Sequence, residues 1–262
     1  MLMLLSRLCV LSAWALSAVQ EARTAAAPPG PTQTLTSEAS IDQLLDAMDL
    51  AGRDLRDFHV VLTLTETDEV TGDSTRRAGQ AWYEGGAEPR LRAVFPTRTV
   101  GGRTIDDKRE YALEGEWLTD RDHRRKVEVR RQVRRPGEKT NLFRLGEGPF
   151  PLPIGQKKED VHRQFEVLKP PLMNSDPENS VRIRLKPRPD TRFAKRVSIM
   201  DIWVDLATGL PRRIVEVSAD GATTRQADFD SIKVNQGVNA ADLRPEPIDE
   251  KAWQRHTEKF EG

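Results

Sequence analysis

Apolar side chains in residues 40–52 recur three and four positions apart, which places them on one face of a helix: Ile41, Leu44, Leu45 and Met48. Ser40 stands at the start of this segment and Gln43 follows three residues later, the spacing of a capping box. Gly52 occupies a position at which a glycine commonly terminates a helix. The pattern predicts one amphipathic helix of about eleven residues.

After residue 57 the period of the pattern changes from that of a helix to that of a strand. Apolar and polar side chains alternate in several short segments, at 58–65, 90–95, 126–133, 181–186 and 215–217. Such alternation is typical of antiparallel strands with one apolar and one solvated face. Glycine-containing turn signals separate these segments. The pattern predicts about ten strands, in a fold that is mainly β with helices (α+β).

A proline-rich segment interrupts the strands. Residues 146–153 (GEGPFPLP) contain too many prolines for a helix or a central strand. Residues 156–168 then place Val161, Phe165 and Leu168 at helical spacing, so we expect a short second helix there. A single sheet with one apolar face has to curl around that face, and the helices have to cover it.

The first 27 residues have the pattern of a cleaved signal peptide. Arg7 precedes an apolar stretch at 8–16 that is too short to span a bilayer as a permanent helix. A buried N-terminal helix is the alternative. We expect four regions: 1–27 as a signal peptide, 28–36 as a flexible tether, 37–250 as the folded domain and 251–262 as a C-terminal tail.

Composition argues against several classes of function. The chain has 41 basic and 41 acidic residues among 262, so no net field favours nucleic acid as a partner. The single cysteine, Cys9, rules out disulfides within the chain and a cysteine-based metal cluster. The sequence also lacks a nucleophile elbow, a phosphate-binding loop and a dinucleotide-binding fingerprint. We therefore expect no catalytic residues, no metal and no cofactor, and a hydrolase with scattered catalytic residues is a third-ranked hypothesis.

Charge is unevenly distributed along the chain. Residues 121–139 hold nine Lys and Arg against three Asp and Glu, a net of +6, whereas residues 40–75 carry a net of −7. Three arginines of the basic segment, Arg130, Arg131 and Arg134, are candidates for a docking surface. Such a surface suits an anionic headgroup or an acidic protein, and an ordinary solvated face is the alternative.

Several motifs, read in order over residues 40–247, resemble the LolA/LolB family of periplasmic lipoprotein carriers. Residues 79–83 (GQAWY) resemble the second strand of that family, and residues 113–118 (LEGEWL) resemble its D-G turn. Residues 202–211 (IWVDLATGLP) are similar to its VD-x-x-TG-LP hairpin. Residues 228–238 (DFDSIKVNQGV) resemble its closing strand.

The chain also departs from the family pattern. Glu114 replaces the usual aspartate of the D-G turn. The arginine beside a proline that helps to hold the family's lid shut has no counterpart in residues 84–89, and Arg90 is only a nearby candidate. The resemblance is therefore to a divergent member.

The resemblance implies an unclosed antiparallel β half-barrel with an N-terminal amphipathic helix and a helical lid, whose concave apolar face takes acyl chains. It implies an exported, periplasmic, non-enzymatic carrier that shuttles the acyl chains of lipoproteins or phospholipids to the outer membrane. Membrane proteins that donate and accept the cargo are the expected partners, and we expect a monomer. An envelope-stress sensor or regulator that binds a protein partner through the same fold is the alternative.

Residues on the apolar faces of the expected strands are the candidates for the lipid-binding cavity, and plain core packing is the alternative for each. These candidates are Val60, Leu62, Leu64, Phe95, Val127, Val129, Ile183, Ile199 and Trp203.

Overall fold

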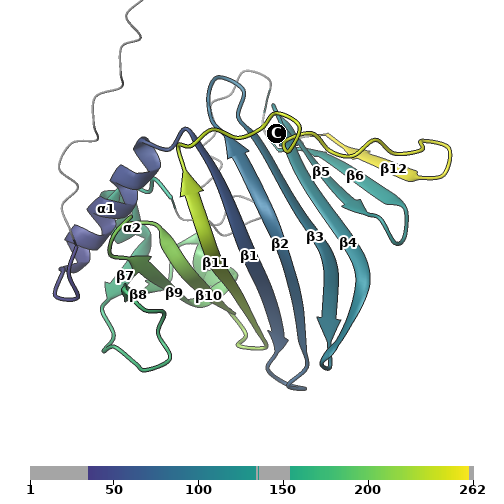
Figure 1. Cartoon of the computed structure of the whole chain (residues 1–262). Coiled ribbons are helices and arrows are strands. Elements are labelled where there is room, and N and C mark those ends of the chain that lie inside the picture. The colour runs from purple at the N-terminus through teal and green to yellow at the C-terminus, as the bar shows by residue number, and fades with distance from the viewer. Residues whose placement is uncertain (1–34, 134, 136–153, 260–262) are drawn as a thin grey trace, which may run out of the picture. The chain divides into compact units, whose positions relative to one another are not determined.

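The structure is a computed structural model that describes residues 35–133, 135 and 154–259. Its strands are β1 (Asp57–Asp68), β2 (Ser74–Glu84), β3 (Arg90–Val100), β4 (Arg103–Glu114), β5 (Trp117–Asp122), β6 (Val127–Gln132), β7 (Phe165–Leu168), β8 (Ser180–Pro187), β9 (Val197–Asp205), β10 (Pro211–Ser218), β11 (Thr223–Val234) and β12 (Gln254–Glu258). Its helices are α1 (Ile41–Arg53) and α2 (Lys158–Gln164), with a 3-10 turn η1 (Arg192–Lys195). Figure 1 shows these elements in place.

All twelve strands belong to one sheet, in the order β12-β6-β5-β4-β3-β2-β1-β11-β10-β9-β8-β7. Every neighbouring pair is antiparallel except β12 and β6, which run parallel. β12 and β7 form the two edges and do not pair with each other, so the sheet is open over the described residues. The prediction of a mainly β fold with a large unclosed antiparallel sheet is confirmed. The described residues form twelve strands instead of about ten, and β12 lies in the segment expected to be a tail.

α1 begins as the sequence predicts. The Ser40 hydroxyl accepts a hydrogen bond from the Gln43 amide (3.2 Å), and the Gln43 side chain accepts one from the Ser40 amide (2.8 Å). These two bonds make a capping box. The expectation that Gly52 ends the helix is wrong, because α1 continues to Arg53. Gly52 instead allows a close approach to the backbone of Gly155.

The second helix is shorter than the pattern over residues 156–168 predicts. α2 ends at Gln164, and Phe165 begins strand β7. β7 pairs with the edge of β8, with Phe165 opposite Pro187 and Val167 opposite Leu185. Phe165 is fully buried in the core. A strand ladder on the open edge of β8 therefore replaces the last turn of the predicted helix.

α2 contacts α1 through one ion pair and one hydrogen bond between exposed side chains. Lys158 Nζ lies 2.9 Å from Asp46, and the His162 ring lies 3.1 Å from Asp42. The negative charge that the sequence concentrates in α1 is thus partly matched by α2.

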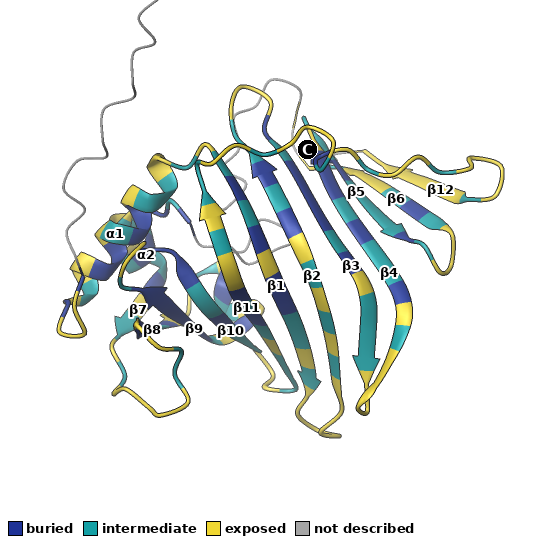
Figure 2. Cartoon of the chain, in the orientation of Figure 1, coloured by how far each residue is buried: buried dark blue, intermediate teal, exposed yellow. Residues whose placement is uncertain are grey.

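The inner face of the sheet is defined here as the face that carries Phe58, Val60 and Leu62 and packs against α1. Because cross-strand partners point to the same side of a sheet, the strand register assigns the other residues to faces. One row of the inner face runs across six strands through Val60, Ala81, Ala93, Tyr111, Asp120 and Val129. Figure 2 shows buried positions alternating with more exposed ones along the strands, as the sequence pattern predicts.

An ion-pair cluster lies on the opposite, outer face around Glu110, which is 1% exposed. The Glu110 carboxylate lies 2.7 Å from Arg92, 3.4 Å from Arg121 and 3.2 Å from His123. Arg121 also binds Glu128 at 2.8 Å. Every charge in this group has a hydrogen-bonded partner of opposite sign, as buried charges require.

Residues 235–253 connect β11 to β12 across the outer face, near the ends of β1, β2 and β3 (Figure 1). Two members of the ion-pair cluster hold this segment through its backbone carbonyls. Arg92 donates to the carbonyl of Asp242 (3.1 Å), and Arg121 donates to the carbonyl of Glu246 (2.6 Å). The cluster therefore fixes the path of the chain toward β12.

Candidate functional site

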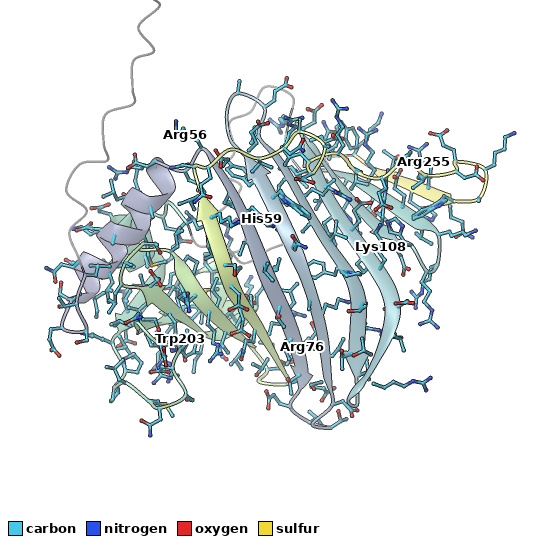
Figure 3. The ribbon with its side chains drawn as sticks, viewed as in Figure 1. Arg56, His59, Arg76, Lys108, Trp203 and Arg255 are labelled. Carbon is cyan, nitrogen blue, oxygen red and sulfur yellow. The ribbon has the colours of Figure 1, made fainter. Side chains whose placement is uncertain are left out.

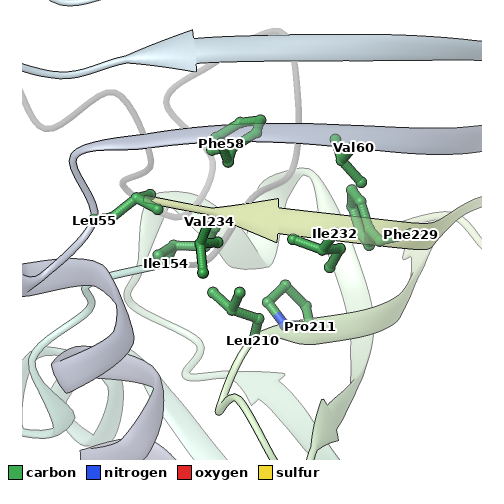
Figure 4. Close-up of a pocket in the computed structure, with 9 residues that line it drawn as sticks. All are labelled: Leu55, Phe58, Val60, Ile154, Leu210, Pro211, Phe229, Ile232 and Val234. Carbon is green, nitrogen blue, oxygen red and sulfur yellow. The ribbon is translucent and has the colours of Figure 1, made fainter. Parts of the chain in front are cut away.

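An apolar pocket lies on the inner face beside the end of α1 (Figure 4). The cavity volume is about 20 Å³. The described side chains of its lining are all apolar: Leu55, Phe58, Val60, Ile154, Leu210, Pro211, Phe229, Ile232 and Val234. Ligand pockets for small molecules span about 300–1,000 Å³, so this pocket is far below that range and has room for little more than one methyl-sized group.

Close backbone contacts position α1 and the segment before α2 at this pocket. A Cβ atom at Gly52 would lie 2.2 Å from the Cα atom of Gly155. Gly155 follows Ile154, whose side chain is buried in the pocket wall. On the other side, a Cβ atom at Gly209 would lie 2.8 Å from the carbonyl oxygen of Ala47. Glycines at these points allow the helix backbone to sit directly against the rim of the pocket.

The turn at residues 205–209 supplies the adjacent wall. The Asp205 carboxylate accepts hydrogen bonds from the amide of Ala207 (3.0 Å) and from the amide and hydroxyl of Thr208 (2.9 Å each). Gly209 then takes a positive φ of 70°. This Asx turn directs Leu210 and Pro211 into the pocket.

Seven of the nine cavity candidates lie on the inner face, but they do not line one cavity. Val60 lines the apolar pocket. Val127 and Val129 line a separate recess that also contains charged side chains. The remaining four are packed into the core: Leu62, Leu64, Phe95 and Ile183.

Ile199 and Trp203 lie on the outer face. Trp203 pairs with Arg213 on β10 and Arg182 on β8, whereas its neighbour Ile202 pairs with Ile214 and belongs to the inner face. Ile199 has the same parity as Trp203 and lies opposite Val217. The structure therefore does not bring these two residues together with the other seven.

Trp203 has a polar environment of its own on β9 (Figure 3). Its indole N–H donates to the Asp176 carboxylate at 2.8 Å. The guanidinium carbons of Arg182 and Arg213 lie 5.5 Å and 5.6 Å from the ring centre. These contacts are cation–π interactions, which hold the ring under the loop before β8.

The arginines of the predicted docking surface do not share one face. Arg130 stacks on Trp117, with 4.8 Å between its guanidinium carbon and the ring centre. Arg131 points to the other side of β6 and lies 2.6 Å from the Glu258 carboxylate on β12. Arg134 lies outside the described residues.

A second recess on the inner face combines opposite charges and was not predicted. Arg109, Asp120, Asp122 and Arg125 line it together with Val127 and Val129. Arg109 lies between the two carboxylates, 3.3 Å from Asp120 and 3.0 Å from Asp122. The alternation in residues 117–122 (WLTDRD) could have indicated that Asp120 and Asp122 share the face of Leu118. It could not place Arg109 beside them, because that contact depends on strand register.

The described residues contain no group of three or more His, Cys, Asp or Glu side chains that could hold a metal ion. Within the same part of the chain, no helix has the length and apolar character needed to cross a membrane.

No model of a protein family matches this chain, and no curated protein matches it. Several solved structures are similar to it. An uncharacterized conserved protein from Thermus thermophilus is 10% identical, with a TM-score of 0.49, over 82% of this chain and 96% of that chain. MucB is 10% identical with a TM-score of 0.46, over 78% of this chain. This chain spans 62% of the length of MucB.

The similar structures also include the LolA superfamily protein NE2245 from Nitrosomonas europaea. It is 10% identical, with a TM-score of 0.31, over 79% of this chain and 99% of that chain.

Proposed function

We propose that this protein is an exported, non-enzymatic carrier that binds acyl chains of lipoproteins or phospholipids on the inner face of its sheet. The observation that carries the proposal is the pocket beside α1, whose nine described lining side chains are all apolar. An acyl chain presents only methylene groups, which such a lining shields from water. Each buried methylene contributes about 0.8 kcal/mol, so affinity grows with the length of chain that the protein covers.

The pocket accommodates only part of a long acyl chain, so a complete chain requires more room along the inner face. In this proposal α1 and α2 act as a lid that moves to provide it. The contacts between α1 and α2 would not resist such movement, because Lys158–Asp46 and His162–Asp42 are exposed polar pairs. Exposed pairs contribute about 1 kcal/mol or less and break easily. The main cost of the movement is the uncovering of Leu44, Leu45 and Met48, which α1 buries in the core. Ligand binding then shifts the lid toward its open position.

The proposed setting is the periplasm, reached through a signal peptide at residues 1–27 that is removed on export. Residues 28–36 would tether the folded domain of residues 37–250. Delivery of the cargo to the outer membrane would involve a membrane protein that donates it and another that accepts it. The apolar stretch at residues 8–16 and the motifs shared with the LolA/LolB family support this assignment.

A fluorescent fatty acid tests the proposed site. Ile232 lines the pocket and is only partly buried, so Ile232→Glu places a charge in the pocket with little damage to the core. We expect this variant to lose affinity about tenfold or more, because a carboxylate is costly in an apolar lining. Val61→Glu is the matched control, because Val61 is exposed on the outer face of neighbouring β1. Equal affinities for both variants and the wild type would exclude the pocket as the binding site.

A protein-binding regulator is the second candidate, and the open edge of the sheet at β12 is the observation that favours it. All five residues of β12 are exposed, and its outer edge is unpaired over the described residues. Such an edge can accept a strand from another protein. Deletion of residues 254–262 should abolish a complex of this kind and leave fatty-acid binding intact.

A further inference from the structure

The recess that contains both charges lies on the same inner face as the apolar pocket. Asp120 and Val129 of its lining belong to the inner-face row that begins at Val60 in the apolar pocket. Four strand spacings separate Val60 from Asp120, about 19 Å along the sheet. The cavity volume of the recess is about 110 Å³. It is therefore a second hollow on this face, with a lining of different chemistry.

The two carboxylates of the recess differ in the hydrogen bonds and ion pairs that they make. Asp122 accepts the amide of Arg125 at 2.9 Å and lies 3.0 Å from the guanidinium of Arg109. Asp120 accepts from Arg109 across a longer distance of 3.3 Å. Burial raises the pKa of Asp120 above its ordinary value of 3.8, and the nearby charges of Arg109 and Arg131 only partly offset this rise. A ligand cation beside Asp120 would stabilise the charged carboxylate and replace the solvation that burial removes.

The guanidinium of Arg125, at the mouth of the recess, is available to a ligand. The Arg125 side chain is 78% exposed and its guanidinium lies 3.7 Å from Asp122, which is longer than a good charge-assisted hydrogen bond. Its donors can therefore turn to a phosphate, which a guanidinium binds in a bidentate manner. Arg109, by contrast, is held between the two carboxylates.

The charges of the recess select for a ligand that carries both signs. Among the described residues of the lining, Arg109 and Arg125 balance Asp120 and Asp122, so neither a simple anion nor a simple cation is favoured overall. The two valines of the lining provide an apolar contact for the part of the ligand nearest its chains.

We propose that this recess binds the zwitterionic headgroup of an aminophospholipid, with the ammonium beside Asp120 and the phosphate beside Arg125. The inference rests on the proposed function in one respect, namely that the acyl chains of this lipid lie on the same inner face. It adds a preference among lipids, which an apolar pocket cannot supply.

Binding of two short-chain lipids to the full chain tests the assignment. Dihexanoyl phosphatidylethanolamine carries both charges, whereas dihexanoyl phosphatidylglycerol has identical chains and lacks the ammonium. We expect calorimetry to show about tenfold tighter binding of the phosphatidylethanolamine, since one charge-assisted hydrogen bond separates the two lipids. Asp120→Asn should remove this preference, and Arg125→Gln should weaken binding of both lipids.

Matched controls use charged residues on the outer face. Asp230→Asn and Arg76→Gln change exposed side chains of β11 and β2 and should leave both affinities unchanged. Free phosphoethanolamine, titrated without chains, should compete with the phosphatidylethanolamine in the wild type and not in Asp120→Asn. Competition that is equal in both proteins would overturn the assignment of the ammonium to Asp120.

Failure of this inference is separable from failure of the carrier function. Equal affinities of the wild type for the two lipids, together with normal binding of a fluorescent fatty acid, would overturn the headgroup site and leave the apolar pocket intact. An unchanged preference in Asp120→Asn would likewise overturn it. Loss of fatty-acid binding in Ile232→Glu is independent of both results.

Discussion

Gly52 and Gly155 meet backbone to backbone, so that a Cβ atom on Gly52 would lie 2.2 Å from the Cα and N atoms of Gly155. The first glycine lies in the last turn of α1, and the second follows Ile154 in the wall of the apolar pocket. The Gly155 amide also donates to the carbonyl of Met48 at 3.2 Å. The contact therefore joins the end of the helix directly to the pocket.

Gly52→Ala is expected to destabilise the protein by about 1–3 kcal/mol, the usual cost of overpacking. The added Cβ atom would meet backbone atoms of Gly155, which cannot rotate away. Chemical denaturation monitored by circular dichroism measures the change. In a helix without this contact the same substitution would stabilise by about 1 kcal/mol, because alanine is the better helix former. A stabilised variant would therefore contradict the close approach.

The Glu110 cluster should be the most sensitive polar group of the sheet. Glu110→Gln leaves Arg92 and Arg121 largely buried with one counter-charge fewer. Breaking a buried pair in this way costs about 3–5 kcal/mol. Glu84→Gln is the control, since Glu84 pairs with Arg90 where both side chains are far more exposed, and it should cost about 1 kcal/mol or less. Similar losses of unfolding free energy in the two variants would refute the central position of Glu110.

Asp107 and Asp120 should affect the pH dependence of stability with opposite signs. Burial tends to raise the pKa of Asp107, but the hydrogen bond from Arg77 and the charges of Arg77 and Arg98 hold it below its ordinary 3.8. A lowered folded-state pKa stabilises the protein above pH 3.8, and this contribution is lost as the pH falls through the folded value. The pKa of Asp120 is raised, so its charge opposes folding at neutral pH and the penalty is relieved on acidification.

Urea denaturation at pH 7, 5 and 3.5 compares the two asparagine variants. Asp107→Asn should lower the unfolding free energy at pH 7. It should also make the fall in unfolding free energy between pH 7 and pH 3.5 smaller than in the wild type. Asp120→Asn should not lower the unfolding free energy at pH 7. It should make the fall in unfolding free energy on acidification steeper, because protonation of Asp120, which stabilises the folded wild type, can no longer occur. Shifts of the same sign in both variants would contradict these environments.

Much of the fold is predictable from local pattern. The capping box at Ser40 and Gln43 locates the start of α1, and the alternation in β1 identifies it as a half-buried strand. β12 was not predictable, because its residues (QRHTE) are all exposed and contain no apolar alternation. What makes it a strand is the free edge of β6, which local sequence does not reveal.

The candidate site was less predictable because it depends on register. Residues 199–204 (IMDIWV) are apolar at both odd and even positions, so alternation alone cannot decide which set faces inward. Pairing with β10 decides it, placing Ile202 inward beside Ile214 and Trp203 outward beside Arg213. The charged recess likewise forms because Arg109 on β4 lies opposite Asp122 on β5.

Trp203→Phe tests this assignment of faces. Phenylalanine removes the hydrogen bond to Asp176 and weakens the stacking with Arg182 and Arg213, so we expect a loss of about 1–2 kcal/mol in unfolding free energy. Affinity for a fluorescent fatty acid should not change, because Trp203 lies on the face opposite the apolar pocket.

Ile232→Glu is the positive control for this measurement, since Ile232 lines that pocket. The two variants should therefore separate stability from binding, with the first losing stability alone and the second losing affinity. A tenfold loss of fatty-acid affinity in folded Trp203→Phe would place acyl binding on the outer face. The row of apolar inner-face side chains would then be core only, and the loop over Trp203 would become the region that contacts the lipid.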